Sequence, residues 1–199
     1  MTRRLLVLLD RDGVLNRDSP NYVKSVEELE IISGSAEAAA ALSNAGHSVV
    51  VVTNQSGIAR GLIEPNALTA IHASIDASVV ACGGQIDHFQ VCPHSPQQRC
   101  PCRKPETGLI VAARAQLADS FDQTLFVGDR ITDLQAAIAS GCHPILVRTG
   151  HGAATERQIT DPNVDPVIPV DARVDIFDDL ACAVDAILGG MFDDRPMSA

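Results

Sequence analysis

The chain has 199 residues, is 46% hydrophobic, and carries 25 acidic against 15 basic residues, for a formal net charge of −10. A chain of this length and apolar content can bury one complete core, since domains commonly run to about 100–200 residues. Its negative surface repels nucleic-acid backbones and anionic lipid, which argues against partners of either kind. We therefore expect a monomer that binds a small molecule.

Two features of the sequence bear on the cellular compartment. The N-terminal apolar run over residues 5–9 ends at Asp10, so it is too short for the core of a signal peptide or for a membrane span. Six cysteines are present, and three of them lie between positions 92 and 102. In a reducing compartment this crowding favours a metal site over a disulfide framework. We predict a cytoplasmic protein.

Apolar runs typical of buried parallel strands alternate with Ala-rich helical segments along the chain. The predicted strands are residues 5–9, 48–52, 86–91, 124–127 and 143–147, with a weaker one at 167–170. The predicted helices are residues 35–45, 64–81, 107–117, 131–140 and 178–188. This alternation predicts an α/β fold, a three-layer Rossmann-like sandwich with a central parallel sheet and with ligands at the carboxyl ends of its strands. We expect one domain over residues 1–188 and a loose tail over 189–199.

The first predicted strand runs directly into Asp10-Arg11-Asp12-Gly13. Two close carboxylates repel each other unless a cation neutralises them or one of them holds a proton and can act as an acid. Both conditions suit phosphoryl transfer. An isolated motif of this kind is more often an acidic loop that ends a strand, so its functional interpretation depends on the motifs that follow.

Polar residues also follow the second and fourth predicted strands. The segment Thr53-Asn54-Gln55-Ser56-Gly57 offers hydroxyls and backbone amides that can hold phosphate oxygens. Gly128-Asp129-Arg130 places a carboxylate where it can complete an oxygen site for magnesium. Asp133, one helical turn later, is expected to cap the helix or to orient Asp129 rather than to bind the metal directly.

A cluster of metal-binding residue types lies between the third strand and the third helix. Cys92, His94, Cys100 and Cys102 supply three thiolates and one imidazole, a complete tetrahedral set for a structural zinc ion. Zinc would order the Pro-rich loop 92–105 and so bring Arg103 and Lys104 to the crevice. Chance clustering or a redox pair is the alternative.

Together, residues 10–13, 53–57, 103–105 and 128–129 resemble the haloacid dehalogenase superfamily, in the order and spacing of its phosphatases. The cysteine pattern is similar to that of the superfamily's zinc-loop branch, and residues 18–23 and 56–61 resemble the heptose-bisphosphate phosphatases of that branch. The resemblance implies a fold without a large cap domain.

The resemblance also implies roles for individual residues. Asp10 would be the nucleophile and Asp12 the proton donor, while Thr53 and Lys104 would stabilise the phosphoryl group. Magnesium would be held by Asp10, Asp12 and Asp129. The implied substrate-binding residues are Asp18, Tyr22, Asn54, Gln55, Ser56, Arg103 and Arg130.

The implied activity is that of a phosphoric monoester hydrolase with catalytic magnesium. It would remove the C7 phosphate of a heptose 1,7-bisphosphate and so supply heptose 1-phosphate for nucleotide-activated heptose and the lipopolysaccharide core. Three alternatives stay open: a histidinol-phosphate phosphatase, a receiver-like domain that accepts a phosphoryl group, and a zinc-organised interaction module without catalysis.

Overall fold

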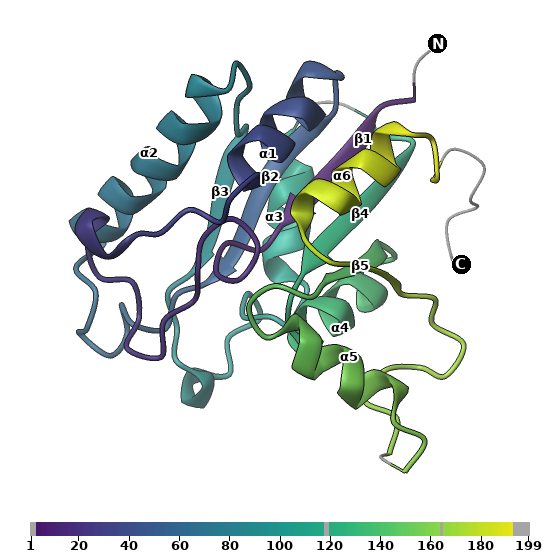
Figure 1. Cartoon of the computed structure of the whole chain (residues 1–199). Helices are drawn as coiled ribbons and strands as arrows, with labels where there is room; N and C mark the ends of the chain where they lie inside the picture. The colour runs from purple at the N-terminus through teal and green to yellow at the C-terminus, as the bar shows by residue number, and fades with distance from the viewer. Residues whose placement is uncertain (1–2, 118–119, 164, 193–199) are drawn as a thin grey trace.

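The computed structural model describes residues 3–117, 120–163 and 165–192 of the chain (Figure 1). The strands are β1 (Leu5–Leu9), β2 (Ser48–Asn54), β3 (His88–Cys92), β4 (Gln123–Gly128), β5 (His143–Val147) and β6 (Asp175–Phe177). The helices are α1 (Ser35–Asn44), α2 (Pro65–Ala81), α3 (Gly108–Gln116), α4 (Ile131–Ala139), α5 (Gly152–Thr160) and α6 (Leu180–Leu188). Two short 3-10 turns are η1 (Val26–Glu28) and η2 (Pro96–Gln98).

The six strands form one parallel sheet in the order β3-β2-β1-β4-β5-β6. Strand β1 lies at the centre, where Leu8 is in register with Val50 of β2 and with Phe126 of β4. The direction of strand succession reverses between β1 and β4. In open α/β sheets this switch point opens a crevice at the carboxyl ends of the strands. Here those ends lead into Asp10 and Asp129.

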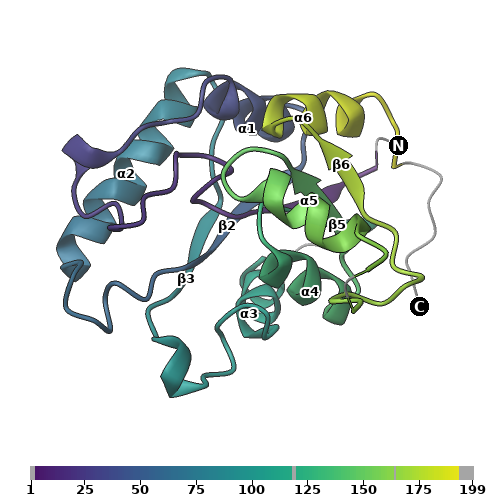
Figure 2. The same cartoon turned by 60° about the horizontal axis from the view of Figure 1, so that its bottom comes forward.

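Helices cover both faces of the sheet, as Figure 2 shows with α1, α2 and α6 on one side and α3 and α4 on the other. Successive side chains of β1 alternate between the two faces because strand side chains repeat every two residues. Val7 and Leu9 pack under α1 and α6, whereas Leu6 and Leu8 pack under α3 and α4. Burial on both faces explains why the strands are continuous apolar runs.

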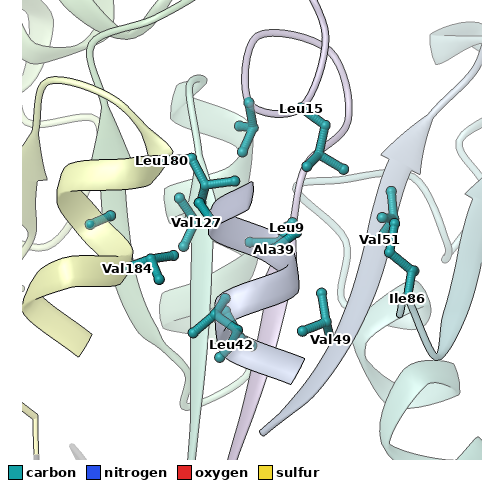
Figure 3. Close-up of a cluster of buried hydrophobic side chains, with 14 of the residues drawn as sticks. Leu9, Leu15, Ala39, Leu42, Val49, Val51, Ile86, Val127, Leu180 and Val184 are labelled. Carbon is teal, nitrogen blue, oxygen red and sulfur yellow. The ribbon is translucent and has the colours of Figure 1, made fainter. Parts of the chain in front are cut away.

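Small residues let α1 approach the sheet closely. Ala39 and Leu42 of α1 are fully buried, and Figure 3 shows them among Leu9, Val127 and Leu180. Full burial of a leucine side chain stabilises the fold by about 1.5–3 kcal/mol. This packed layer holds β1 and β4 rigidly below the residues that follow them.

The fold class and the alternation of elements are confirmed, and two details differ from the prediction. No strand forms at 167–170, because Pro169 cannot donate a ladder hydrogen bond and Val170 is 87% exposed. The last strand is instead β6. Helix α5 was not predicted, since only Gly152 and Thr155 of its nine residues are buried and no apolar stripe marks it.

The C-terminal boundary is set by Phe192, which is 1% exposed and packs edge-on against His143. Of the segment predicted as a loose tail, residues 189–192 are therefore attached to the core, and residues 193–199 lie outside the described residues. Within the part of the chain that the structure describes, no helix has the length and apolar content to cross a membrane.

Candidate active site

A cleft of about 1110 Å³ opens at the carboxyl ends of the central strands. Its walls come from the loops after β1 and β2, the loop before α3, and the beginnings of α4 and α5. Every residue predicted as catalytic or substrate-binding lines it: Asp10, Asp12, Asp18, Tyr22, Thr53, Asn54, Gln55, Ser56, Arg103, Lys104 and Arg130. Segments more than 100 residues apart in sequence thus meet in one cavity.

Lys104 lies at the floor of this cleft with its side chain only 1% exposed. Its Nζ is 2.9 Å from Asp10 Oδ1 and 2.8 Å from Asp133 Oδ1, and it donates a 2.8 Å hydrogen bond to the carbonyl of Val52. Asn54 holds the Lys104 backbone through two 3.1 Å hydrogen bonds, one to its N–H and one to its carbonyl. The ammonium group is therefore fixed beside the Asp10 carboxylate.

Three buried carboxylates surround this single cation. One oxygen each from Asp10, Asp129 and Asp133 lies within 4.8 Å of the others. Burial, together with the charges of Asp133 and Asp12, raises the pKa of Asp10 to about 7, although Lys104 acts in the opposite direction. Burial and the charges of Asp10 and Asp133 raise the pKa of Asp129 to about 8. The cluster carries more negative charge than Lys104 can balance.

The two carboxylate oxygens of Asp129 differ in their hydrogen bonding. Its Oδ2 accepts a 2.7 Å hydrogen bond from the backbone N–H of His151, and its buried Oδ1 has no hydrogen-bond partner among the described residues. Gly13 and Gly150 both have positive φ and pack so closely that an added Cβ would lie 2.2 and 2.3 Å from Asp129 Oδ2. Oxygen donors arranged in this way suit a hard cation such as Mg²⁺.

The Asp12 side chain lies outside the three-carboxylate cluster. Its oxygens accept hydrogen bonds from Arg11 Nη2 at 2.7 and 2.9 Å, from Asn16 Nδ2 at 2.9 Å and from Gln55 Nε2 at 2.8 Å. Burial alone would raise the pKa of Asp12, but the Arg11 charge and these hydrogen bonds outweigh it and hold the pKa below its usual value. Asp133, not Asp12, completes the side-chain cluster with Asp10 and Asp129.

A second group of metal-ligand atoms lies beside the cleft, in the loop after β3. Cys92 Sγ is 3.5 Å from Cys100 Sγ, which is 3.3 Å from Cys102 Sγ. His94 Nδ1 is 3.7 Å from Cys92 Sγ and 3.3 Å from Cys102 Sγ. A tetrahedron with metal–sulfur bonds of about 2.3 Å has edges of about 3.8 Å. The four side chains therefore fit a closed zinc site.

The loop between β1 and η1 crosses the cleft and contacts both of its sides. Asp18 Oδ2 is 2.6 Å from Arg130 Nη2 and 3.1 Å from His151 Nε2. Tyr22, with φ of 63°, places its hydroxyl 3.3 Å from Ser56 Oγ. These contacts connect the segment 18–22 to the loop after β2 and to the beginnings of α4 and α5.

Comparison with known proteins identifies the family. A family model described as HAD-hydrolase-like matches residues 101–171. The D-glycero-β-D-manno-heptose-1,7-bisphosphate 7-phosphatase of Pseudomonas putida is 44% identical over 177 residues, which cover 88% of this chain and 95% of the relative. The enzyme of the same name from Pseudomonas aeruginosa is 42% identical over 93% of this chain and 98% of its own. The chain belongs to this heptose-bisphosphate phosphatase family.

A solved structure supports the assignment to the heptose-bisphosphate phosphatase family. It is that of D,D-heptose 1,7-bisphosphate phosphatase from Bordetella bronchiseptica complexed with magnesium and phosphate. The two structures agree with a TM-score of 0.80 at 38% identity, over 94% of this chain and 98% of that one. The family predicted from the motifs is thereby confirmed.

Some features of this family member's site could not be predicted from its sequence. Arg11 stands between two aspartates and was assigned no role from the sequence, yet it is buried and binds Asp12. The backbone N–H of His151 reaches Asp129 from a segment that carried no recognisable motif. Asn54 and Gln55, which are predicted to bind substrate, line the cleft, and their amides also bind Lys104 and Asp12.

The raised pKa values predict how stability of this phosphatase changes with pH when metal is removed. Asp10 and Asp129 keep their protons to higher pH in the folded chain than in the unfolded chain. The folded state therefore binds more protons, and the free energy of unfolding falls as pH rises toward 8. The lowered pKa of His72, about 4, acts in the opposite direction only below about 6.5.

Thermal denaturation in a chelator should accordingly give a lower Tm at pH 8.0 than at pH 6.5. Adding MgCl₂ should raise the Tm more at pH 8.0, because protons no longer compete for the carboxylates. An equal Mg²⁺ effect at both pH values would show that Asp10 and Asp129 do not titrate as described.

Proposed function

We propose that the chain hydrolyses the C7 phosphate of D-glycero-D-manno-heptose 1,7-bisphosphate through a phosphorylated Asp10. The observation that carries the proposal is the contact between Lys104 Nζ and Asp10 Oδ1, 2.9 Å long, at the floor of a large polar cleft at the sheet's switch point. A buried ammonium group there lowers the cost of bringing a phosphate dianion against a carboxylate. The family names supply the sugar.

In the first step, an Asp10 oxygen attacks phosphorus while the bond between phosphorus and the C7 oxygen breaks. The leaving oxygen takes a proton from Asp12, whose carboxyl group lies in the same cleft. Lys104 and the hydroxyl of Thr53 stabilise the charge on the transferring phosphoryl oxygens. Because Arg11 favours the ionised carboxylate, Asp12 must gain its proton once substrate is bound.

In the second step, a water molecule attacks the phosphorylated Asp10 and transfers a proton to the Asp12 carboxylate. The bond between phosphorus and Asp10 breaks, which releases inorganic phosphate and regenerates the nucleophile. The hydrogen bonds from Arg11, Asn16 and Gln55 hold Asp12 in the ionised form that this step requires.

Magnesium is the proposed cofactor of both steps. The carboxylates of Asp10 and Asp129 would hold it, and it would neutralise charge on the phosphoryl oxygens. Asp133 would act mainly on Lys104, since its two oxygens lie 2.8 Å from Lys104 Nζ and 3.0 Å from the backbone N–H of Arg130. The fit of Asp129, with one free buried oxygen, supports this assignment. A ligand role for Asp12 remains a prediction.

Sugar recognition is assigned to the rim of the cleft. Arg103 and Arg130 supply guanidinium groups for the second phosphate and the sugar oxygens. Asp18 and Tyr22 supply a carboxylate and a hydroxyl group from the loop that crosses the cleft, and Ser56 supplies a hydroxyl group from the loop after β2. A negatively charged protein thus offers locally positive groups to an anionic substrate.

Product analysis tests the proposed reaction. The full chain with MgCl₂ is given heptose 1,7-bisphosphate, and the products are followed by ³¹P NMR. We expect one equivalent of inorganic phosphate while the anomeric C1 phosphate resonance persists. Loss of the C1 resonance first would contradict the proposal.

Zinc at Cys92, His94, Cys100 and Cys102 is proposed to be structural, because the four ligands leave no position for substrate. Cys102→Ser should abolish the bound zinc and lower the Tm by several degrees, since the loop that carries Arg103 would lose its order. Metal analysis and thermal denaturation measure both effects.

Cys182→Ser is the matched control for zinc binding, because Cys182 is exposed on α6 and lies outside the cluster. It should keep one zinc per chain and an unchanged Tm. Full stability of Cys102→Ser after verified loss of zinc would refute the structural role.

The proposed setting is the cytoplasm, where a reducing environment keeps the cysteine cluster available to metal. The product, heptose 1-phosphate, would feed synthesis of nucleotide-activated heptose and of the lipopolysaccharide core. A non-catalytic zinc module is not favoured, since it leaves Lys104 between Asp10 and Asp133 without a role.

A further inference from the structure

Among the buried polar atoms that have no hydrogen-bond partner in the described residues, three belong to residues that interact with Asp12. They are Arg11 Nη1, Asn16 Oδ1 and His72 Nε2. Unpaired buried polar atoms are uncommon in folded proteins, and each one calls for an explanation. One of the three is a donor and the other two can accept, so their chemistry is complementary.

Arg11 and Asn16 meet at Asp12. The Arg11 Nε and Nη2 groups bind Asp12 Oδ1 at 3.2 and 2.7 Å, and Nη2 also reaches Oδ2 at 2.9 Å. Asn16 Nδ2 donates to the same Asp12 Oδ1 at 2.9 Å. Two nitrogens of the guanidinium group therefore bind Asp12, while the third, Nη1, is buried and has no hydrogen-bond partner in the described part of the chain.

His72 lies on α2, which covers the same face of the sheet as α1. Its ring stacks on Phe89 of β3 with centroids 4.6 Å apart and an angle of 14°. Burial, reinforced by the nearby charge of Arg11, lowers the pKa of His72 to about 4, so the imidazole is neutral at neutral pH. A neutral imidazole has one nitrogen that accepts hydrogen bonds.

We propose that Arg11 is a positioning residue for Asp12 and that one buried water molecule fastens it by accepting from Nη1 and donating to His72 Nε2 and Asn16 Oδ1. Buried waters typically make about three hydrogen bonds to otherwise unpaired groups, as this one does. The series of hydrogen bonds from His72 of α2 through the water and Arg11 then fixes the direction in which Asp12 faces the leaving group. This step rests on the proposed function, in which Asp12 exchanges a proton with substrate.

Kinetics on two kinds of substrate separate positioning from general damage. The heptose phosphate releases a poor alkoxide leaving group that needs a proton, whereas p-nitrophenyl phosphate releases a phenolate that does not. Arg11→Lys keeps the charge and loses the fork. Because Asp12 is also the base of the second step for either substrate, the rate of the first step is measured by rapid quenching. We expect Arg11→Lys to lower that rate on the heptose bisphosphate by about 100-fold, with KM within twofold and the rate of the same step on p-nitrophenyl phosphate within about threefold.

Variants of His72 test, in the same assay, whether the hydrogen bond from the water to His72 Nε2 helps to position Arg11. His72→Phe keeps the ring on Phe89 and removes the acceptor, and we expect about a 10-fold loss in the rate of the first step, confined to the heptose substrate. His72→Gln retains an acceptor and should restore the rate of that step to within about threefold of the wild type. Thr69→Val, an exposed change on α2, is the control for the helix itself.

Asp12→Asn separates failure of the inference from failure of the proposed function. If Asp12→Asn slows the first step equally on both substrates, Asp12 is not the proton donor and the proposed function fails at that step. If Asp12→Asn is selective for the heptose substrate but Arg11→Lys and His72→Phe are not, the inference is overturned while the proposed function stands.

A measurement on the wild-type chain tests the proposal even when a variant does not fold. The ¹⁵N chemical shifts of the His72 ring report which nitrogen carries the proton. We expect the Nδ1–H tautomer with an unprotonated Nε2. A proton on Nε2 would overturn the proposal, because that nitrogen could not accept from the water.

Discussion

Asp10→Asn is expected to abolish turnover, with a loss of at least about 10⁴-fold in kcat, because an amide oxygen cannot form the covalent phosphoryl intermediate. The substitution conserves the shape of a side chain that is 5% exposed. It removes one negative charge from a cluster in which burial and like charges already raise the pKa of Asp10 to about 7. Stability should therefore be maintained or increased, although Lys104 loses part of its pairing.

Phosphate release and thermal denaturation measure both effects on the same samples. Rapid acid quenching with ³²P-labelled substrate should trap label on the wild-type chain and none on Asp10→Asn. Asp185→Asn is the matched control, since Asp185 is exposed on α6 and contributes nothing to the cleft. Turnover of Asp10→Asn near the wild-type rate would remove Asp10 from the mechanism.

Lys104→Met is expected to damage both activity and stability. Lys104 is the buried cation that touches Asp10 and Asp133, and removing one partner of a buried ion pair typically costs about 3–5 kcal/mol. Methionine keeps the aliphatic stem that packs near Phe126, so the loss reports the charge rather than a cavity. Without the ammonium group, kcat should fall by about 10³-fold.

The chain has one other lysine, which provides a matched control. Lys24→Met removes an ammonium group that, among the residues that the structure describes, pairs with Glu28 at the surface, so activity and Tm should be unchanged. Part of the stability lost in Lys104→Met should return at lower pH, because Asp10 can then take up a proton. Full activity of Lys104→Met would show that magnesium alone neutralises the phosphoryl group.

Much of the fold and the general position of the site could be predicted from the sequence. Strands buried on both faces appear as continuous apolar runs, so the ends of 5–9 and 124–127 could be located, and with them Asp10 and Asp129. The cysteine cluster could be predicted equally well, because its four candidate ligands lie within eleven consecutive residues. Local patterns of this kind report elements and the loops between them.

The direction in which side chains point within the site could not be predicted. The role of Asp12 as a magnesium ligand stays a prediction, but its carboxylate binds Arg11 and Asn16 and lies outside the cluster of Asp10, Asp129 and Asp133. These contacts depend on the packing of loops that are far apart in sequence. Helix α5 was missed because its sequence is polar on average and only Gly152 and Thr155 of its residues are buried.

The central claim is that this cleft hydrolyses a heptose bisphosphate. The most direct test is steady-state phosphate release with MgCl₂, which compares kcat/KM for D-glycero-D-manno-heptose 1,7-bisphosphate, as α and β anomers, with kcat/KM for histidinol phosphate. We predict a preference of at least about 100-fold for a heptose bisphosphate, since a site built for a second phosphate loses charged contacts with histidinol phosphate. A preference for histidinol phosphate would contradict the assigned substrate while leaving the chemistry at Asp10 open to the same tests.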